Sequence, residues 1–256
     1  RRFGTRKALL CGGNALLDQL AVLKECALDA GDAVVGEYGR ANIAELAAAP
    51  AADVAIDFSG PEALPAVAAY VARTGTPLVS GTTGYTAGEK AAVAALGEHA
   101  PVVWSANYSL GVAVLARALR LVTAALRPDF DIEVTETHHN RKKDAPSGTA
   151  ITLAEGIAEN LAGKQGWVNL APGIEHAANR IERSGEAPAD RIEIRSVREG
   201  AVPGIHTVTY ESEDDVLEIR HTIKNRRTLA LGAVVAAEFL CGKQGVYSMD
   251  DLLRNA

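Results

Sequence analysis

Residues 136–149 hold the side chains of this chain that are best suited to chemistry. Two adjacent histidines, His138 and His139, precede a basic run that ends at Lys143. Imidazole and ammonium groups bind carboxylates, and both can give up a proton near neutral pH when their surroundings tune the pKa. The basic run taken alone fits a solvated loop equally well. A metal site is disfavoured, because consecutive strand residues point to opposite faces and two such histidines do not easily share one ion.

The segments on either side of this run should position it. Apolar and polar residues alternate over residues 130–135, which predicts a strand with one buried face. Pro146 disfavours helix before it, and Ser147 is a typical N-cap residue for the helix that follows. The backbone N–H groups of Gly148 and Thr149 would then point out of the helix start, where anions bind readily. The whole unit therefore suits a small ligand that carries carboxylates.

Composition indicates an ordinary globular protein. The chain has 256 residues, of which 48% are hydrophobic and 23% charged, and its net charge of −6 disfavours nucleic acid as a partner. Cys11, Cys26 and Cys241 are widely spaced without a C-x-x-C pair, as expected for free thiols in a reducing compartment. No apolar run approaches about 18 residues, so we expect no membrane span. The opening Arg1-Arg2 has no apolar segment behind it, so we expect no signal peptide and a cytoplasmic location.

The first half of the chain alternates buried strands with helices. Strands are predicted at Lys7–Cys11 and Ala33–Val35, with a helix from Ala15 to Ala30 between them. Such a β-α-β opening is typical of a nucleotide-binding domain. Further elements are strands at Val54–Phe58, Leu78–Val79 and Pro101–Ser105, and a short helix and linker at Ala41–Ala52. The pattern predicts a Rossmann-like α/β domain over residues 1–108, completed by C-terminal helices within residues 228–256.

The loop after the first strand departs from the usual dinucleotide pattern. Where a Rossmann loop has three glycines, this chain has Gly12, then Ala15 and Asp18. A Cβ at the second position and a carboxylate at the third both work against a bound pyrophosphate. After the second strand, Glu37 could accept hydrogen bonds from a ribose diol, and Arg40 could meet a 2′-phosphate instead. Both could equally be exposed loop charges, so the preferred cofactor stays open.

The second half is predicted to form an α+β domain over residues 109–227. A long amphipathic helix is predicted at Val112–Leu126. A mixed sheet of about four strands is predicted from the runs Phe130–Thr137, Arg191–Val197, His206–Tyr210 and Val216–Thr222. Residues 163–188 are poorly periodic and predict a long loop, with a short helix near Glu175–Ile181.

Several motifs indicate a family. The ungapped run E-T-H-H-N-R-K-K-D-A-P-S-G-T-A at Glu136–Ala150 resembles the signature of 4-hydroxy-tetrahydrodipicolinate reductase, also called dihydrodipicolinate reductase. Four more motifs are similar to the same family: D-F-S-x-P-E from Asp57, G-T-T-G-Y from Gly81, A-N-Y-S from Ala106 and R-x-G-x-x-P-G-x-H-x-V from Arg198. The resemblance covers nearly the whole chain and fails mainly at the first glycine loop.

The resemblance implies that the chain reduces a cyclic imine dicarboxylate with NADH or NADPH on the route to lysine. Hydride addition to such a conjugated imine requires a proton at the other end of the system. By resemblance, His138 is the acid/base residue and Lys142 the second proton donor. The implied substrate-binding residues are His139, Lys142, Ser147, Gly148, Thr149 and Arg226. The implied cofactor-binding residues are Gly12, Glu37, Arg40, Phe58, Gly81, Thr82, Thr83, Ser105, Ala106, Asn107 and Tyr108.

The resemblance also implies a homotetramer assembled through the sheets of the substrate domain. The location would be the cytoplasm or, in a plant, the plastid stroma. No metal, nucleic acid or membrane is implied as a partner. Asn140 and Lys143 differ from the residues common in the family, and both could change substrate affinity. Tyr108 could equally be a core aromatic residue.

Two other functions stay open. A non-catalytic relative that binds a carboxylate ligand would account for Ala15 and Asp18 in the glycine loop. A reductase of the same architecture could instead act on another imine or carbonyl compound. A titration with NADH and NADPH distinguishes the first of these from an enzyme, because a cofactor-impaired relative would not bind either one.

Overall fold

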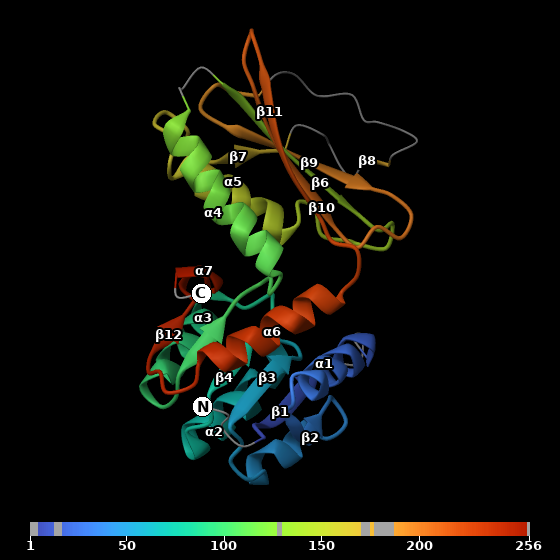
Figure 1. Ribbon diagram of the computed structural model, residues 1–256, viewed down its shortest axis with the longest axis vertical. Helices are drawn as coiled ribbons and strands as arrows, with labels where there is room; N and C mark the ends of the chain where they lie inside the picture. The colour runs from blue at the N-terminus through green and yellow to red at the C-terminus, as the bar shows by residue number, and fades with distance from the viewer. Residues whose placement is uncertain (1–4, 13–16, 127–129, 170–174, 177–186, 255–256) are drawn as a thin grey trace. The chain divides into compact units, whose positions relative to one another are not determined.

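A computed structural model describes residues 5–12, 17–126, 130–169, 175–176 and 187–254 of the chain (Figure 1). The chain divides into two compact units: unit 1 comprises residues 1–110 and 226–256, and unit 2 comprises residues 111–225. Each unit has its own sheet and its own hydrophobic core. Among the described residues, no helix is long and apolar enough to cross a membrane.

Unit 1 contains a six-stranded sheet in the order β12-β5-β4-β3-β1-β2, in which every neighbouring pair is parallel. Its strands are β1 (Lys7–Gly12), β2 (Ala33–Tyr38), β3 (Val54–Phe58), β4 (Leu78–Ser80), β5 (Val102–Trp104) and β12 (Val246–Tyr247). The predicted α/β class with a Rossmann-like first sheet is thereby confirmed. The sequence did not reveal β12, because its two residues are too few to show a period.

Five helices and three 3-10 turns accompany this sheet in the described part of unit 1. They are α1 (Leu17–Asp29), α2 (Leu64–Thr74), α3 (Ala87–Ala95), α6 (Arg227–Phe239) and α7 (Met249–Arg254), with 3-10 turns at Ile43–Ala48, Pro61–Ala63 and Leu96–Glu98. α6 packs against α1, β3 and β4, so the end of the chain completes the unit built by its beginning (Figure 1). The helix expected within Ala41–Ala52 is a 3-10 segment, which suits a short connection.

Unit 2 contains a mixed sheet in the order β11-β10-β6-β9-β7, and β8 also pairs with β9. Its strands are β6 (Asp131–His138), β7 (Trp167–Val168), β8 (Glu175–His176), β9 (Ile192–Arg198), β10 (Ile205–Glu211) and β11 (Val216–Thr222). The four strands expected for this sheet are present as β6, β9, β10 and β11, and the two short strands β7 and β8 add to them. The helix expected near Glu175–Ile181 is wrong at Glu175–His176, which pair with β9, and residues 177–181 lie outside the described part.

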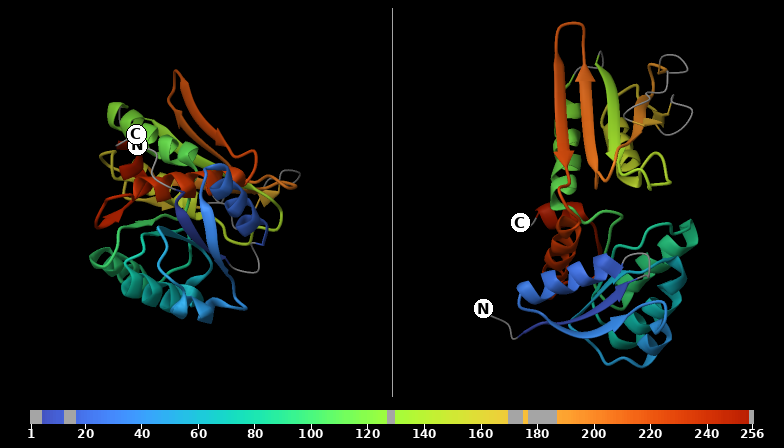
Figure 2. Two further views of the ribbon diagram at one scale, coloured as in Figure 1. Left: turned by 60° about the horizontal axis from the view of Figure 1, so that its bottom comes forward. Right: turned by 90° about the vertical axis from the view of Figure 1, so that its right-hand side faces the viewer.

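Two helices, α4 (Leu110–Ala125) and α5 (Gly148–Ala158), cover one face of the second sheet (Figures 1 and 2). Ile132 and Val134 of β6 lie in this core, together with Val208 of β10. Because strand side chains alternate in direction, Glu136 and His138 must point to the same face as Ile132 and Val134. The apolar face thus becomes polar towards the carboxyl end of β6, and both polar residues are buried.

Candidate active site

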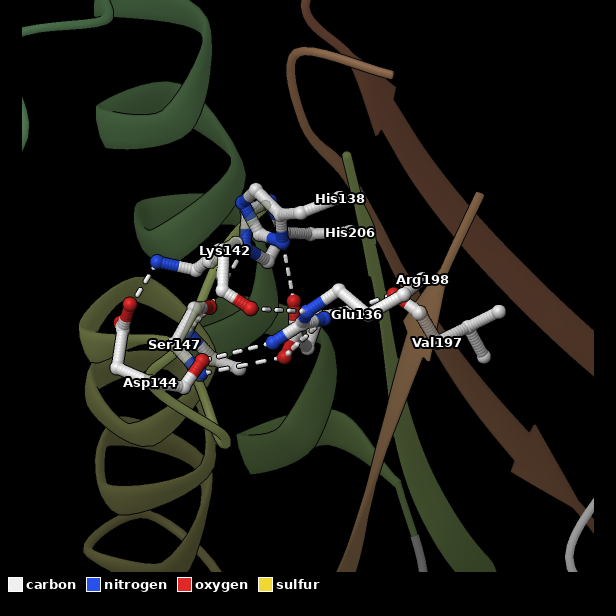
Figure 3. Close-up of polar contacts among 9 residues, drawn as sticks. Glu136, His138, Lys142, Asp144, Ser147, Val197, Arg198 and His206 are labelled. Carbon is white, nitrogen blue, oxygen red and sulfur yellow. Dashed lines mark hydrogen bonds and ion pairs between the residues drawn. The ribbon is translucent and has the colours of Figure 1, made fainter. Parts of the chain in front are cut away.

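The polar end of the second sheet brings together three strands, a loop and a helix start (Figure 3). On the sheet, His138 of β6 lies opposite Arg198 of β9, and Glu136 lies opposite His206 of β10. These pairings collect charged groups from segments that are far apart in the sequence. The loop after β6 adds Lys142, and it leads to the first turn of α5.

Glu136 and Arg198 form a buried ion pair at the base of this cluster. Arg198 Nη1 lies 3.1 Å from Glu136 Oε1, and the side chains of both residues are fully buried. The same guanidinium donates to the carbonyl oxygens of Val197 at 2.7 Å, Asp144 at 2.7 Å and Lys142 at 3.3 Å. Arg198 therefore anchors the loop at Lys142 and Asp144 while it neutralises Glu136 (Figure 3).

His138 contacts Glu136 through its Nδ1 atom, which lies against Glu136 Oε2. Burial by itself would raise the pKa of Glu136, but the hydrogen bond and charge of His138 and the charge of Arg198 lower it below its ordinary value. Glu136 is therefore a carboxylate at neutral pH and accepts a hydrogen bond from Nδ1. The other ring nitrogen, Nε2, is then the atom of His138 that can exchange a proton with a ligand.

A second histidine packs against the first. The ring of His206 lies edge-on to that of His138, with the centroids 5.3 Å apart, and its Nε2 atom lies 3.2 Å from Ser147 Oγ. Burial and the nearby charge of His138 lower the pKa of His206 to about 3, so its ring is neutral at physiological pH. Among the described residues, no group of three His, Cys, Asp or Glu side chains could hold a metal ion.

Lys142 lies at the rim of the cluster. Its Nζ atom lies 2.6 Å from Asp144 Oδ2, and the lysine side chain is 19% exposed while that of Asp144 is 63% exposed. Partial burial opposes the ionisation of Asp144, yet its hydrogen bond with Lys142 lowers its pKa overall. The ammonium group is therefore held by a partner that solvent can reach, and a ligand carboxylate could replace that partner.

The first turn of α5 closes the cluster on one side. Ser147 is its N-cap residue, as predicted: the side-chain oxygen accepts from Ala150 N at 3.2 Å. The backbone N–H of Ser147 donates to Glu136 Oε1 at 3.3 Å, which ties the cap to the buried ion pair. Gly148 is exposed and Thr149 is half-buried at the helix start. Half-buried His139 follows β6 directly, at the beginning of the loop.

A separate pocket of about 400 Å³ lies in unit 1, at the carboxyl ends of β3, β4 and β5. This is the edge of a parallel sheet where ligands usually bind. Seven of the predicted cofactor residues line it together: Phe58, Gly81, Thr82, Thr83, Ala106, Asn107 and Tyr108. Ser105 supports the lining from behind, because its hydroxyl donates to the carbonyl oxygen of Asn107 at 2.9 Å.

Asp57 is a buried carboxylate behind this pocket. It accepts hydrogen bonds from Ser59 Oγ at 2.5 Å, Ser59 N at 3.0 Å and Thr82 Oγ1 at 2.9 Å. Burial raises the pKa of Asp57 despite these hydrogen bonds. Since Ser59 follows β3 and Thr82 follows β4, one carboxylate fastens two of the loops that line the pocket.

Tyr108 is a core aromatic residue, one of the two roles considered for it in the sequence, and its predicted contact with the cofactor stays a prediction. Its hydroxyl donates towards the carbonyl oxygens of Ser80 and Val103, each at 2.9 Å, and its buried ring packs edge-on against Phe58. It also lines the pocket. Gly81 is required nearby, since an added Cβ would lie only 2.3 Å from a ring carbon of Phe58.

Gly12, Glu37 and Arg40 do not line this pocket. Gly12 is buried at the end of β1, where an added Cβ would lie 3.3 Å from the side chain of Leu20. Ala15 lies outside the described residues, as does the side chain of Asp18. Their predicted effects on a dinucleotide stay predictions.

The two charged candidates near the end of β2, Glu37 within the strand and Arg40 after it, pair with neighbouring side chains. Glu37 lies 2.5 Å from Lys24, and Arg40 lies 3.4 Å from Glu62. Arg226 belongs to unit 1 as the N-cap residue of α6, and it lines a small pocket there with Phe58. Its predicted contact with the substrate stays a prediction.

The sequence of the chain matches two models of one family. "Dihydrodipicolinate reductase, N-terminus" matches residues 24–108, and "Dihydrodipicolinate reductase, C-terminus" matches residues 111–253. The chain belongs to the dihydrodipicolinate reductase family. The family predicted from the motifs is therefore confirmed.

Named relatives of the family are close in sequence. The 4-hydroxy-tetrahydrodipicolinate reductase of Desulfovibrio desulfuricans is 42% identical over 84% of this chain and 80% of the relative. That of Anaeromyxobacter dehalogenans is 42% identical over 88% of this chain and 82% of the relative. Among solved structures, a dipicolinate-bound dihydrodipicolinate reductase from Paenisporosarcina sp. TG-14 superimposes with a TM-score of 0.71 at 20% identity, covering 95% of this chain and 97% of the other. This last similarity shows the shared fold.

Four residues of these sites had no role in the sequence prediction: Asp57, Glu136, Arg198 and His206. A signal was present for two of them. Glu136 has the same parity as Ile132 and Val134, so a buried carboxylate on β6 could have been inferred. Asp57 follows an apolar run that reads as a fully buried strand. Arg198 and His206 had no such signal in their local pattern; both belong to the family-like motif from Arg198, but their roles could not be inferred because their partners lie on other strands.

Proposed function

We propose that this protein reduces 4-hydroxy-tetrahydrodipicolinate to tetrahydrodipicolinate in the diaminopimelate route to lysine. The reaction consumes one hydride from NADH or NADPH and one proton, and it releases one water. The observation that carries the proposal is the convergence of His138 and Lys142 with the first turn of α5, in a member of this family. Proton donors and an anion-binding helix start are what reduction of a dicarboxylate imine requires.

In this proposal His138 exchanges the proton through Nε2, and Lys142 is the second proton donor. The N–H groups of Gly148 and Thr149 hold a substrate carboxylate at the start of α5. His139, the Ser147 hydroxyl and Arg226 add further polar contacts. His206 adds no positive charge beside His138, because the His206 ring is neutral at physiological pH.

The pocket in unit 1 fits the nicotinamide end of a dinucleotide. Gly81 lets the ring of Phe58 pack against the backbone of the pocket wall, and the pocket lies at the ligand-binding edge of a parallel sheet. The bound cofactor supplies the hydride. Gly81, Thr82 and Asn107 would hold it there, while Gly12, Glu37 and Arg40 would contact its phosphates and ribose.

The proposal covers both NADH and NADPH. Glu37 would accept from the ribose diol of NADH, whereas Arg40 would pair with the 2′-phosphate of NADPH. Each of these side chains has an exposed partner of opposite charge, Lys24 or Glu62, that a cofactor could displace. Dissociation constants for the two cofactors, measured by nicotinamide fluorescence, decide the preference. Failure to bind either would favour the non-catalytic relative.

We further propose that four copies assemble in the cytoplasm through the outer face of the second sheet. Val216 of the edge strand β11, which lies opposite Glu211 on this face, is 60% exposed. An exposed edge strand of this kind usually needs cover. Light scattering tests the assembly, because a single species near the monomer mass of 26.8 kDa would contradict it.

The reductase activity is tested by NADH and NADPH oxidation with enzymatically generated substrate. We expect wild type to turn over and His138→Ala to lose about 10²- to 10⁴-fold in kcat. His99→Ala is the matched control, because His99 is an exposed histidine of unit 1, and it should retain the wild-type rate. Equal rates for wild type and His138→Ala would show that His138 does not act as proposed. Full activity only on another imine or carbonyl would favour the related reductase.

A further inference from the structure

Glu136 and Arg198 are the two charged residues of the cluster that the proposed proton transfer does not use. Their side chains are fully buried, with no exposed surface on either. Removing two charges from water is costly, and an ion pair of this kind often gives no more stability than apolar residues of equal size. A role in stability alone therefore does not explain the pair, and its contacts point to His138.

We propose that Glu136, held by Arg198, is a positioning residue that fixes the tautomer and the orientation of the His138 ring. This inference rests on the proposed function, in which His138 is the acid/base residue. The carboxylate accepts the Nδ1 proton, so the neutral ring keeps its hydrogen on Nδ1 and presents Nε2 to the substrate. A carboxylate that orients a catalytic imidazole acts in this way in other enzymes.

Glu136 is itself held on several sides, so it can impose a direction on the ring. Oε1 accepts from Arg198 Nη1 at 3.1 Å and from Ser147 N at 3.3 Å. Oε2 is thereby left for His138 Nδ1 (Figure 3). The carboxylate cannot rotate away from the ring without losing hydrogen bonds to β9 and to the α5 cap.

The groups around His138 carry different charges. Arg198 and Lys142 are cationic, while His206 is neutral and His221 has its pKa lowered by burial. Glu136 carries the carboxylate that contacts the His138 ring. It therefore places a negative charge on the Nδ1 side of the ring.

Space at Nε2 is provided by Gly204, which precedes β10. A Cβ built on Gly204 would lie 3.2 Å from His138 Nε2, which is closer than about nine in ten real contacts of a Cβ. Any larger residue would press on the nitrogen that must meet the substrate. In one orientation of the His138 ring, Nδ1 is hydrogen-bonded to Glu136 and Nε2 stays accessible beside Gly204.

The direct test is 15N NMR of the histidine rings in ligand-free protein, which reports the tautomer without any turnover. In wild type we expect neutral His138 to carry its proton on Nδ1. Glu136→Gln should lose this single tautomer and give mixed or reversed signals, whereas Glu136→Asp should restore much of it. Glu133→Gln is the matched control, because it removes the same charge from the opposite face of β6, and it should leave the His138 signals unchanged.

Kinetics give a second readout. Glu136→Gln should lower kcat about a hundredfold or more with KM unchanged, because a misoriented ring affects proton transfer more than binding. Glu136→Asp should recover most of that loss, and Glu133→Gln should show none. Gly204→Ala should also lower kcat, whereas Gly156→Ala, where an added Cβ meets nothing within 4 Å, should not.

A wild-type His138 ring protonated on Nε2 would overturn the inference, as would unchanged ring signals in Glu136→Gln. If Glu136→Gln does not fold, the wild-type tautomer and Glu136→Asp still decide the matter. Failure of the proposed function is a different result: wild type would then show no reductase activity, while the tautomer could still be the one expected.

Discussion

Two buried carboxylates, Asp57 in unit 1 and Glu136 in unit 2, each lie near the carboxyl end of a strand beside a candidate site. Asp57 is surrounded by hydroxyl and amide donors from Ser59 and Thr82, and burial raises its pKa. Glu136 is also buried, which by itself would raise its pKa, but the contacts with His138 and Arg198 lower the pKa below its ordinary value. Burial alone therefore does not decide the state of a carboxylate; the charge of its partners does.

The difference corresponds to two kinds of site. Around Asp57 the pocket is built from loops whose backbone and hydroxyl groups must be held in place, which neutral hydrogen bonds can do. Around Glu136 the proposed proton transfer requires a charge that stays fixed at the working pH. One carboxylate fastens loops, and the other acts on a titratable ring.

The largest effect expected from this comparison is on stability. Glu136→Gln leaves Arg198 as a buried charge without its carboxylate, so the free energy of unfolding should fall by about 3–5 kcal/mol. Asp57→Asn replaces one hydrogen-bond acceptor of the carboxyl group but leaves no buried cation, so the loss should be about 1–3 kcal/mol. Urea denaturation of both variants measures the difference. Equal losses of unfolding free energy in the two variants would show that the buried charge of Arg198 adds nothing to the cost of removing the Glu136 carboxylate.

The pH dependence of stability should have opposite signs for the two carboxylates. Because the folded pKa of Glu136 is lowered, its contribution is present above about pH 4.3, the ordinary glutamate value, and is lost as the pH falls through the folded pKa. Because that of Asp57 is raised, its contribution is present below about pH 3.9 and is lost as the pH rises through the folded pKa. Unfolding free energies of wild type, Glu136→Gln and Asp57→Asn, compared from pH 3 to 7, check the two slopes. Slopes of the same sign would contradict the comparison.

Gly81→Ala tests whether the pocket beside Asp57 binds the dinucleotide. The added methyl group would push on Phe58, which also lines the pocket, so cofactor affinity should fall about tenfold. Gly88→Ala is the matched control, since nothing lies within 4 Å of a Cβ there, and it should bind as wild type does. Nicotinamide fluorescence titrations measure both. Unchanged affinity in Gly81→Ala would place the cofactor elsewhere.

The smallest effect is expected at the exposed pair of Lys142 and Asp144. Asp144→Asn breaks an ion pair whose carboxylate is 63% exposed, so stability should change by less than about 1 kcal/mol. Thermal unfolding of this variant beside Glu136→Gln compares an exposed pair with a buried one in the same cluster. A loss as large as that of Glu136→Gln would mean that the loop depends on this contact.

Much of the fold could be predicted because most of its helices and strands are long enough to show a regular pattern of apolar residues. Five of the six parallel strands of unit 1, the long helix α4 and the Ser147 cap of α5 were predicted from apolar patterns and local residue chemistry. The two-residue strands β7, β8 and β12 were missed, and a helix was wrongly expected at Glu175–His176. Strands this short carry no period, and their pairing with a neighbour decides their conformation.

The candidate site was predicted only in part. The residues that are contiguous in the chain, from His138 to Thr149, could be recognised together. Seven residues from three separate motifs were also predicted as cofactor contacts, and the structure brings them into one pocket. The supporting residues were not recognised, because Arg198 is 62 residues from Glu136, and Thr82 is 25 from Asp57. The roles assigned to these residues stay predictions until the experiments above are done.

The sequence by itself determined the family, the class of fold and the run of residues able to bind an anion and donate a proton, because these depend on local chemistry and spacing. The tertiary structure decided which nitrogen of His138 is open, because that depends on a carboxylate two residues away being held by an arginine from another strand. It likewise decided that Asp57 faces hydroxyls and Glu136 faces cations. A sequence specifies the charge of a side chain, but only folding selects the partners that set its protonation and direction.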